Sequence, residues 1–87
     1  MSEDSLLDFP CDIPVKVFGR NEPGFREIVL SIMQRHFSDL SDADVAERPS
    51  SKSSYLSLTI VVTAQNREQI DAVYQELSAH DDVMMAL

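Results

Sequence analysis

The chain has 87 residues, of which 44% are hydrophobic, so we expect one domain with a single modest core. Fifteen acidic residues against seven basic ones give a formal net charge of −8, which argues against general binding to nucleic acid or to an anionic membrane surface. The single cysteine, Cys11, excludes an internal disulfide, no apolar run is long enough to span a bilayer, and together these features predict a cytoplasmic protein.

The first part of the chain is acidic. Residues 1–12 carry four carboxylates and no basic residue, and we expect them to form a flexible N-terminal segment ahead of a single domain at 13–87. Residues 13–19 place β-branched side chains at every second position, a period that predicts a strand ending at Gly19.

The only two glycines, Gly19 and Gly24, stand in the turn that follows this strand. An apolar stripe of helical spacing begins at Phe25 and predicts a helix to about residue 37. The turn has two interpretations. The favoured one is a purely structural connection, because turn chemistry alone requires such residues. The alternative is a backbone cradle for a small ligand at the helix N-terminus, formed by Gly19, Asn21, Gly24 and Phe25.

Residues 38–42 have the composition of a loop, and 44–48 predict an edge strand because Pro49 does not suit a central one. Residues 55–63 alternate so cleanly between apolar and polar side chains that we expect an antiparallel strand with one buried and one open face. The open face is expected to carry Tyr55, Ser57, Thr59 and Val61, together with Lys16 and Phe18.

The loop between these two strands is a second candidate site. Its polar tip, with Ser50, Ser51 and Lys52 followed by Tyr55, has the donors to contact an anion or an acidic partner. The alternative is a solvated hairpin loop without a function, which the composition alone favours.

Asn66 caps a second predicted helix that ends near residue 80, and 83–87 predict a last strand. The order strand, helix, strand, strand, helix, strand with one polar sheet face predicts an α+β fold. We expect a ferredoxin-like βαββαβ two-layer sandwich, with an antiparallel sheet of order 4-1-3-2 and both helices on one face.

The sequence contains no convincing catalytic set. His36 and His80 each lie near a predicted helix C-terminus, where the helix dipole explains them, and no metal-ligand spacing accompanies either. The glycine turn is superficially similar to the phosphate loop of acylphosphatases, with Arg26 as the phosphate ligand. That family also needs a strand asparagine, and neither Asn21 nor Asn66 falls in the required strand, so we predict no enzyme, cofactor or metal.

Two resemblances bear on function. Gly19 to Phe25 is similar to the strand-to-helix signature of ACT-type regulatory domains, which implies binding of an amino acid or other small carboxylate in that turn. Over nearly the whole chain, the hairpin Pro49-Ser50-Ser51-Lys52 and the strand pattern of Tyr55, Ser57 and Thr59 resemble the YbeD family of small bacterial proteins. The YbeD resemblance implies the ferredoxin-like fold and supplies no activity.

The sequence therefore predicts a non-enzymatic binding or regulatory module that acts through a protein partner or by pairing with a second copy. The alternative is an ACT-like sensor for a small-molecule effector at the glycine turn.

Overall fold

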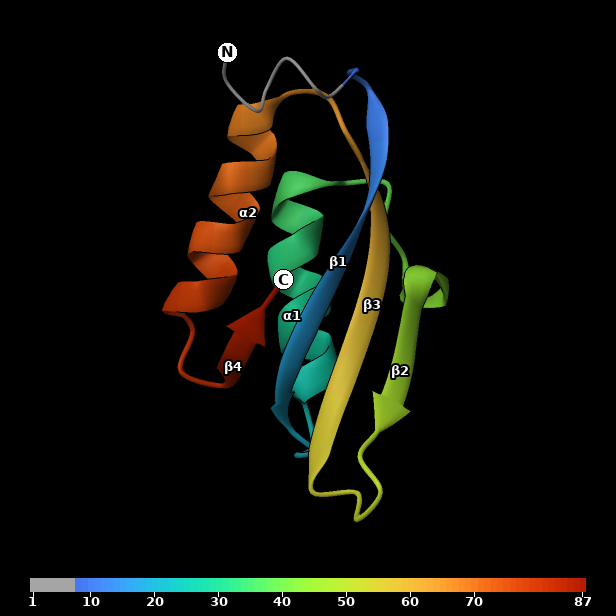
Figure 1. Cartoon of the computed structure of the whole chain (residues 1–87), viewed down its shortest axis with the longest axis vertical. Coiled ribbons are helices and arrows are strands. Elements are labelled where there is room, and N and C mark those ends of the chain that lie inside the picture. Colours follow the sequence, from blue (N-terminus) through green and yellow to red (C-terminus); the bar gives the residue numbers. More distant parts are fainter. Residues whose placement is uncertain (1–7) are drawn as a thin grey trace.

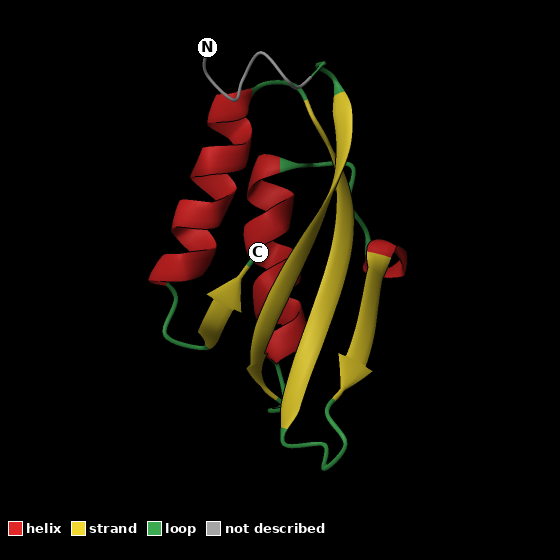
Figure 2. Cartoon of the chain, in the orientation of Figure 1, coloured by secondary structure: helices red, strands yellow, loops and turns green. Residues whose placement is uncertain are grey.

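The computed structural model of the chain describes residues 8–87. Four strands, two α-helices and one short 3-10 helix follow one another as β1 (Cys11–Arg20), α1 (Phe25–His36), η2 (Asp42–Asp44), β2 (Val45–Pro49), β3 (Tyr55–Ala64), α2 (Arg67–Ala79) and β4 (Val83–Ala86). Both helices lie on one side of the sheet, and the other side is uncovered (Figures 1 and 2).

The sheet confirms the predicted fold class. Its strands are arranged in the order β2-β3-β1-β4, which is the predicted 4-1-3-2 counted from the opposite edge. Strand β1 pairs antiparallel with β3 and β4, and β2 pairs antiparallel with β3. The molecule is a ferredoxin-like βαββαβ sandwich of two layers.

Most element bounds agree with the sequence expectations to within about one residue, and two features differ more. Strand β1 begins at Cys11, two residues before the expected start at 13, and it continues to Arg20. The 3-10 helix Asp42–Asp44 was not expected, and it takes in the residue assigned to the start of the second strand. Most of the acidic segment predicted to be flexible, residues 1–7, lies outside the described residues, so its flexibility stays a prediction.

The core occupies the space between the sheet and the helices. Alternate residues of β1 and β3, such as Val17 and Leu58, are fully buried against apolar side chains of both helices, such as Met33 and Leu77. In the described part of the chain no polar or charged side chain is buried. The buried face is therefore purely apolar, and the polar and charged side chains lie on the open face of the sheet, on the outer surfaces of the helices and in the connecting turns.

Pro14 and Pro49 each stand where the backbone nitrogen faces a side of the strand that has no neighbouring strand. Lys16 and Leu87 exchange backbone hydrogen bonds of 2.9 and 2.8 Å. Positions two apart face the same side of a strand, so the backbone of Pro14 faces the β4 side of β1, beyond the point where the pairing with β4 ends. Ser50 donates its N–H to Tyr55 of β3, so the nitrogen of Pro49 in edge strand β2 faces away from the sheet. Neither proline interrupts the hydrogen bonds between strands. Because proline has no backbone N–H, each leaves an exposed strand edge without a free donor at that position.

Candidate functional site

The β1–α1 turn is packed around the ring of Phe25. A methyl group added at Gly19 would lie 2.5 Å from two ring atoms of Phe25 and 2.6 Å from the carbonyl oxygen of Asp82. Phe25 is itself only 2% exposed. Gly19 is thus required by close packing, and the aromatic ring fills the space above it.

Gly24 has a different role in the same turn. Its φ of 88° lies in the left-handed region, and it forms the N-cap of α1. The N–H of Ile28 donates to the Gly24 carbonyl at 2.9 Å, and nothing lies within 4 Å of where a side chain would begin. The backbone at Gly24 is therefore open to solvent.

Asn21 joins the glycine turn to the second candidate segment. Its side-chain Nδ2 donates to the Ser53 carbonyl at 3.0 Å, and its backbone N–H donates to the Ser54 carbonyl at 3.0 Å. The structure thus brings the turn and the β2–β3 hairpin side by side. Asn21 is engaged in that connection, and Gly24 is the member of the predicted ligand set that stays open. The ligand-binding role of the set stays a prediction.

The hairpin loop is held by its own first residue. The Ser50 hydroxyl accepts from the Tyr55 N–H at 3.1 Å, and the Ser50 carbonyl accepts from the Ser53 N–H at 2.8 Å. Ser51 and Lys52 are exposed beyond this closure, and within residues 8–87 their side chains have no hydrogen bond or ion pair. The hydrogen bonds that close the loop account for the presence of Ser50, whereas the side chains of Ser51 and Lys52 are free to contact a partner.

The open sheet face has the composition that the strand alternation predicted. In the register, Phe18 of β1 lies opposite Ser57 of β3, which lies opposite Arg48 of β2, and Met85 of β4 lies on the other side of Phe18. Three solvent-open hollows of about 430 Å³ each meet at Phe18. One of them is lined by Phe18, Gly19, Tyr55, Met84 and Met85.

Large exposed apolar side chains gather on this side of the molecule. Among the described residues they all belong to β3, to β4 or to the residue after β4, and they are Tyr55 (49% exposed), Val61 (55%), Met84 (61%), Met85 (52%) and Leu87 (60%). The sequence pattern did not identify Met84 and Met85 as site residues. A register shift between Phe18 and Gly19 leaves both methionines exposed, and such a bulge has no signal in the residue types of β4.

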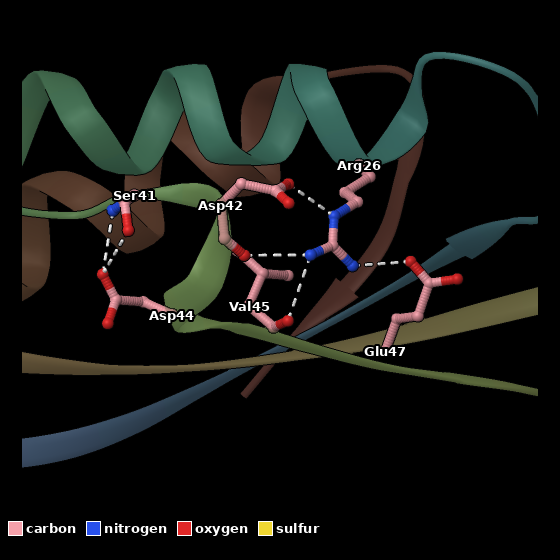
Figure 3. Close-up of polar contacts among 6 residues, drawn as sticks. All are labelled: Arg26, Ser41, Asp42, Asp44, Val45 and Glu47. Atoms are coloured by element: carbon pink, nitrogen blue, oxygen red, sulfur yellow. Dashed lines mark hydrogen bonds and ion pairs between the residues drawn. The ribbon is translucent and has the colours of Figure 1, made fainter.

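A cluster around Arg26 fixes the start of α1 to η2 and β2 (Figure 3). The guanidinium of Arg26 donates to Asp42 Oδ1 at 2.8 Å, to Glu47 Oε1 at 2.6 Å, and to the carbonyls of Asp42 and Val45. Hydrogen bonds to the two carboxylates raise the pKa of Arg26, and the hydrogen bond from Arg26 lowers the pKa of Asp42. The guanidinium of Arg26 is occupied by these contacts.

A more polar hollow of about 380 Å³ lies at the opposite end, where the loop after α1 passes β3. Two of its polar side chains, His36 and Gln69, already have partners inside the protein. His36 Nε2 lies 2.7 Å from Glu76 Oε1, and Gln69 donates to the His36 carbonyl at 2.7 Å while accepting from the Gln65 N–H at 2.8 Å. Arg35 also pairs with Glu76, so these groups fasten α1 to α2.

Metal-binding clusters and membrane-spanning helices are absent from residues 8–87. These residues contain no group of three or more His, Cys, Asp and Glu side chains placed to hold a metal ion. No helix among them has the length and apolarity to cross a membrane.

Comparisons with known proteins cover nearly the entire chain. Residues 4–87 match the family described as "Protein of unknown function (DUF493)". The chain is 41% identical to a UPF0250 protein of Nitrosomonas europaea over 87 residues, all of both chains. It is 44% identical to one of Leptothrix cholodnii, covering 98% of this chain and 93% of the relative, and 37% identical to one of Neisseria meningitidis, covering 99% and 94%. The YbeD-like resemblance seen in the sequence is confirmed.

Proposed function

The chain belongs to the DUF493 family, and we propose that it works as a non-enzymatic binding module that docks a protein on the open face of its sheet. The docked protein is a partner or a second copy of the chain. The residues that carry the proposal are Phe18, Tyr55, Met84 and Met85, with the hairpin residues Ser51 and Lys52 at the margin.

One observation carries this proposal. Among residues 8–87, three of the five large exposed apolar side chains, Tyr55, Met84 and Met85, line the hollows at Phe18, whereas the helix layer packs its apolar side chains into the core. Aromatic and methionine side chains in a depression are typical of the centre of a protein interface. A gathering of exposed apolar side chains is also uncommon on a surface that meets only water.

The non-enzymatic part is supported by the state of the groups that catalysis would use. Within residues 8–87, His36 contacts Glu76, and His80 accepts at Nδ1 from the Asp82 N–H at 3.1 Å. Arg26 is held by two carboxylates. Ser38 and His36 line one hollow, but within residues 8–87 no hydrogen bond joins them and His36 Nε2 is held by Glu76, so a paired nucleophile and base is not formed there.

The test is capture of bound proteins from a lysate of the source organism with wild-type protein and with the Tyr55→Ser/Met85→Ser double variant. Both side chains are about half exposed, so the variant should fold normally while losing the apolar hollow. Val61→Ser is the matched control, because Val61 is 55% exposed on the same face but does not line the hollows at Phe18.

We expect the wild type and Val61→Ser to retain the same bound proteins and the double variant to lose them. Light scattering of the three purified proteins separates a partner from a second copy, because self-association at this face would be lost only in the double variant. Identical capture and identical mass for all three proteins would contradict the proposal.

An ACT-like sensor is the second candidate, and the open backbone at Gly24 is the observation that favours it. Its support is smaller because Phe25 fills the space at Gly19 and Asn21 is bonded to the hairpin. Titration of isotope-labelled protein with a panel of amino acids and small carboxylates tests it. Amide shifts centred on Gly24 and Phe25 would support a sensor, and the absence of shifts at millimolar ligand would remove it.

A further inference from the structure

We propose that the partner of the open face is an acidic protein segment that carries one large apolar side chain. The apolar side chain enters the hollow between Phe18, Tyr55 and Met85, and flanking carboxylates pair with Lys16, Arg48 and, at the hairpin tip, Lys52. This inference rests on the proposed function and adds the chemistry of the partner.

The basic residues of the chain are divided between the two layers. Arg26, Arg35 and Arg67 belong to the helices and each forms an ion pair with a carboxylate of the chain. The other four, Lys16, Arg20, Arg48 and Lys52, lie on β1, on β2 or in the hairpin loop. Within residues 8–87 none of these four has an ion pair, and all are exposed.

The positions of these cations follow from the register. Arg48 shares one row across the sheet with Phe18 and Met85, and Lys16 lies in the next row opposite Thr59. Lys16 and Arg48 line a common hollow of about 430 Å³ with Phe18. The cations are thus beside the apolar depression, at a spacing that one bound segment spans.

Among residues 8–87, few carboxylates compete for these cations. Asp12 is the one acidic residue at an open-face position of the described strands, and it lies in the far half of β1, where it accepts from Thr63 at 2.7 Å. Glu47 lines the hollow of Lys16 and Arg48 but is bound to Arg26. Arg20 differs, since Glu22, Asp81 and Asp82 line a hollow with it, and we leave it out of the site.

Charge complementarity selects the acidic segment over a second copy and over nucleic acid. Two copies docked face to face would bring Lys16, Arg48 and Lys52 of each chain together, with Asp12 as the one open-face carboxylate of the described strands and Glu47 already bound to Arg26, and like charges at an interface are unfavourable. The field of a chain with net charge −8 repels both anions at long range, but it repels a nucleic acid, with a charge on every phosphate, more strongly than a short segment with a few carboxylates. A short acidic segment engages the local cations and buries its apolar anchor.

The test is selection from a random-peptide display library on the immobilised full chain. We expect the enriched peptides to combine aspartate or glutamate with one large apolar residue. One enriched peptide is then titrated against wild type, Arg48→Gln and the matched control Arg35→Gln, which removes the same charge from the helix layer. Because exposed charge pairs are weak, Arg48→Gln should lower the affinity about two- to fivefold, Lys16→Gln/Arg48→Gln should lower it further, and Arg35→Gln should leave it unchanged.

The outcomes separate this inference from the proposed function. Peptides without acidic residues that still require Tyr55 and Met85 would overturn the acidic partner and leave the docking face standing. Peptides that bind the Tyr55→Ser/Met85→Ser variant as well as wild type, or a library that yields no binder, would overturn both. A short single-stranded RNA that binds through Arg48 more tightly than the peptides would replace the acidic segment. Thermal unfolding of each variant confirms that it is folded.

Discussion

Gly19 and Gly24 stand five positions apart in one turn, and a methyl group at each would meet a different obstacle. At Gly19 the obstacle is space, because the ring of Phe25 and the Asp82 carbonyl are both closer than 3 Å to the added carbon. At Gly24 the obstacle is the backbone angle, since φ is 88° and the surrounding space is empty. The two glycines are therefore required by packing and by conformation respectively.

We predict that Gly19→Ala lowers the free energy of unfolding by about 1–3 kcal/mol, the usual cost of overpacking a core. Gly24→Ala should cost about 1–2 kcal/mol through the left-handed backbone alone. Urea unfolding measures both. Trimming the ring with Phe25→Leu should reduce the cost of Gly19→Ala and leave that of Gly24→Ala unchanged. An equal cost of Gly19→Ala in both backgrounds would contradict the packing explanation.

The ion pair between Arg26 and Asp42 predicts a pH dependence of stability. Arg26 lowers the pKa of Asp42 in the folded state, so the pair contributes fully above the ordinary aspartate pKa, about 3.9, and is lost as the pH falls through the lower folded value. We expect wild type to be more stable than Asp42→Asn by a constant margin at neutral and mildly acidic pH. The margin in urea midpoint should narrow as the pH falls below the ordinary aspartate value and through the lowered pKa of Asp42. A margin that stays constant throughout this acid range would exclude the pair as its cause.

At the scale of the elements, the exposed strand edges are protected against pairing, so a partner is expected on the face of the sheet. An exposed strand margin invites pairing with another chain, and prolines are one of the ways in which natural sheets prevent it. Pro14 occupies the part of β1 beyond its pairing with β4, and Pro49 occupies the outer side of β2. β4 itself has only four residues, Val83–Ala86.

We predict that Pro14→Val promotes self-association, because it adds an outward N–H and a residue with high strand preference to the open half of β1. Sedimentation velocity at rising protein concentration should show dimers or larger species in the variant and fewer in wild type. Val61→Thr is the control, since it changes a side chain on the sheet face without changing the margin. Unchanged sedimentation of Pro14→Val would mean that the margin is blocked by other means.

The sequence was sufficient for features that depend on local pattern. Alternation in β3 predicted its bounds to within one residue and its open face, and Asn66 was correctly identified as a cap, its side chain accepting from the Gln69 N–H. Contacts between distant residues could not be predicted this way. Arg26 reaches Asp42 and Glu47, 16 and 21 residues away, and the bulge that exposes Met84 depends on how β4 pairs with β1.

For the whole molecule, the two-layer architecture gives each central strand one structural face and one face that is free for binding. Helices cover only the side of the sheet that carries Val17 and Leu58, both 0% exposed. The next pair in the register, Phe18 and Ser57, faces the open side of the sheet. Folding does not bury these two side chains completely, so they are free to vary with function. Stability and binding can thus be altered separately in one strand.

The last prediction tests this division within β3. Leu58→Ala removes a fully buried side chain and should lower the free energy of unfolding by about 2–5 kcal/mol, a large share of the total for a domain of this size. Val61→Ala, three residues later on the open face, should change it by less than about 0.5 kcal/mol, because Val61 is 55% exposed. Urea unfolding at two protein concentrations measures both. A large, concentration-dependent loss in Val61→Ala would mean that a second copy covers the open face, and it would replace the acidic partner with self-association.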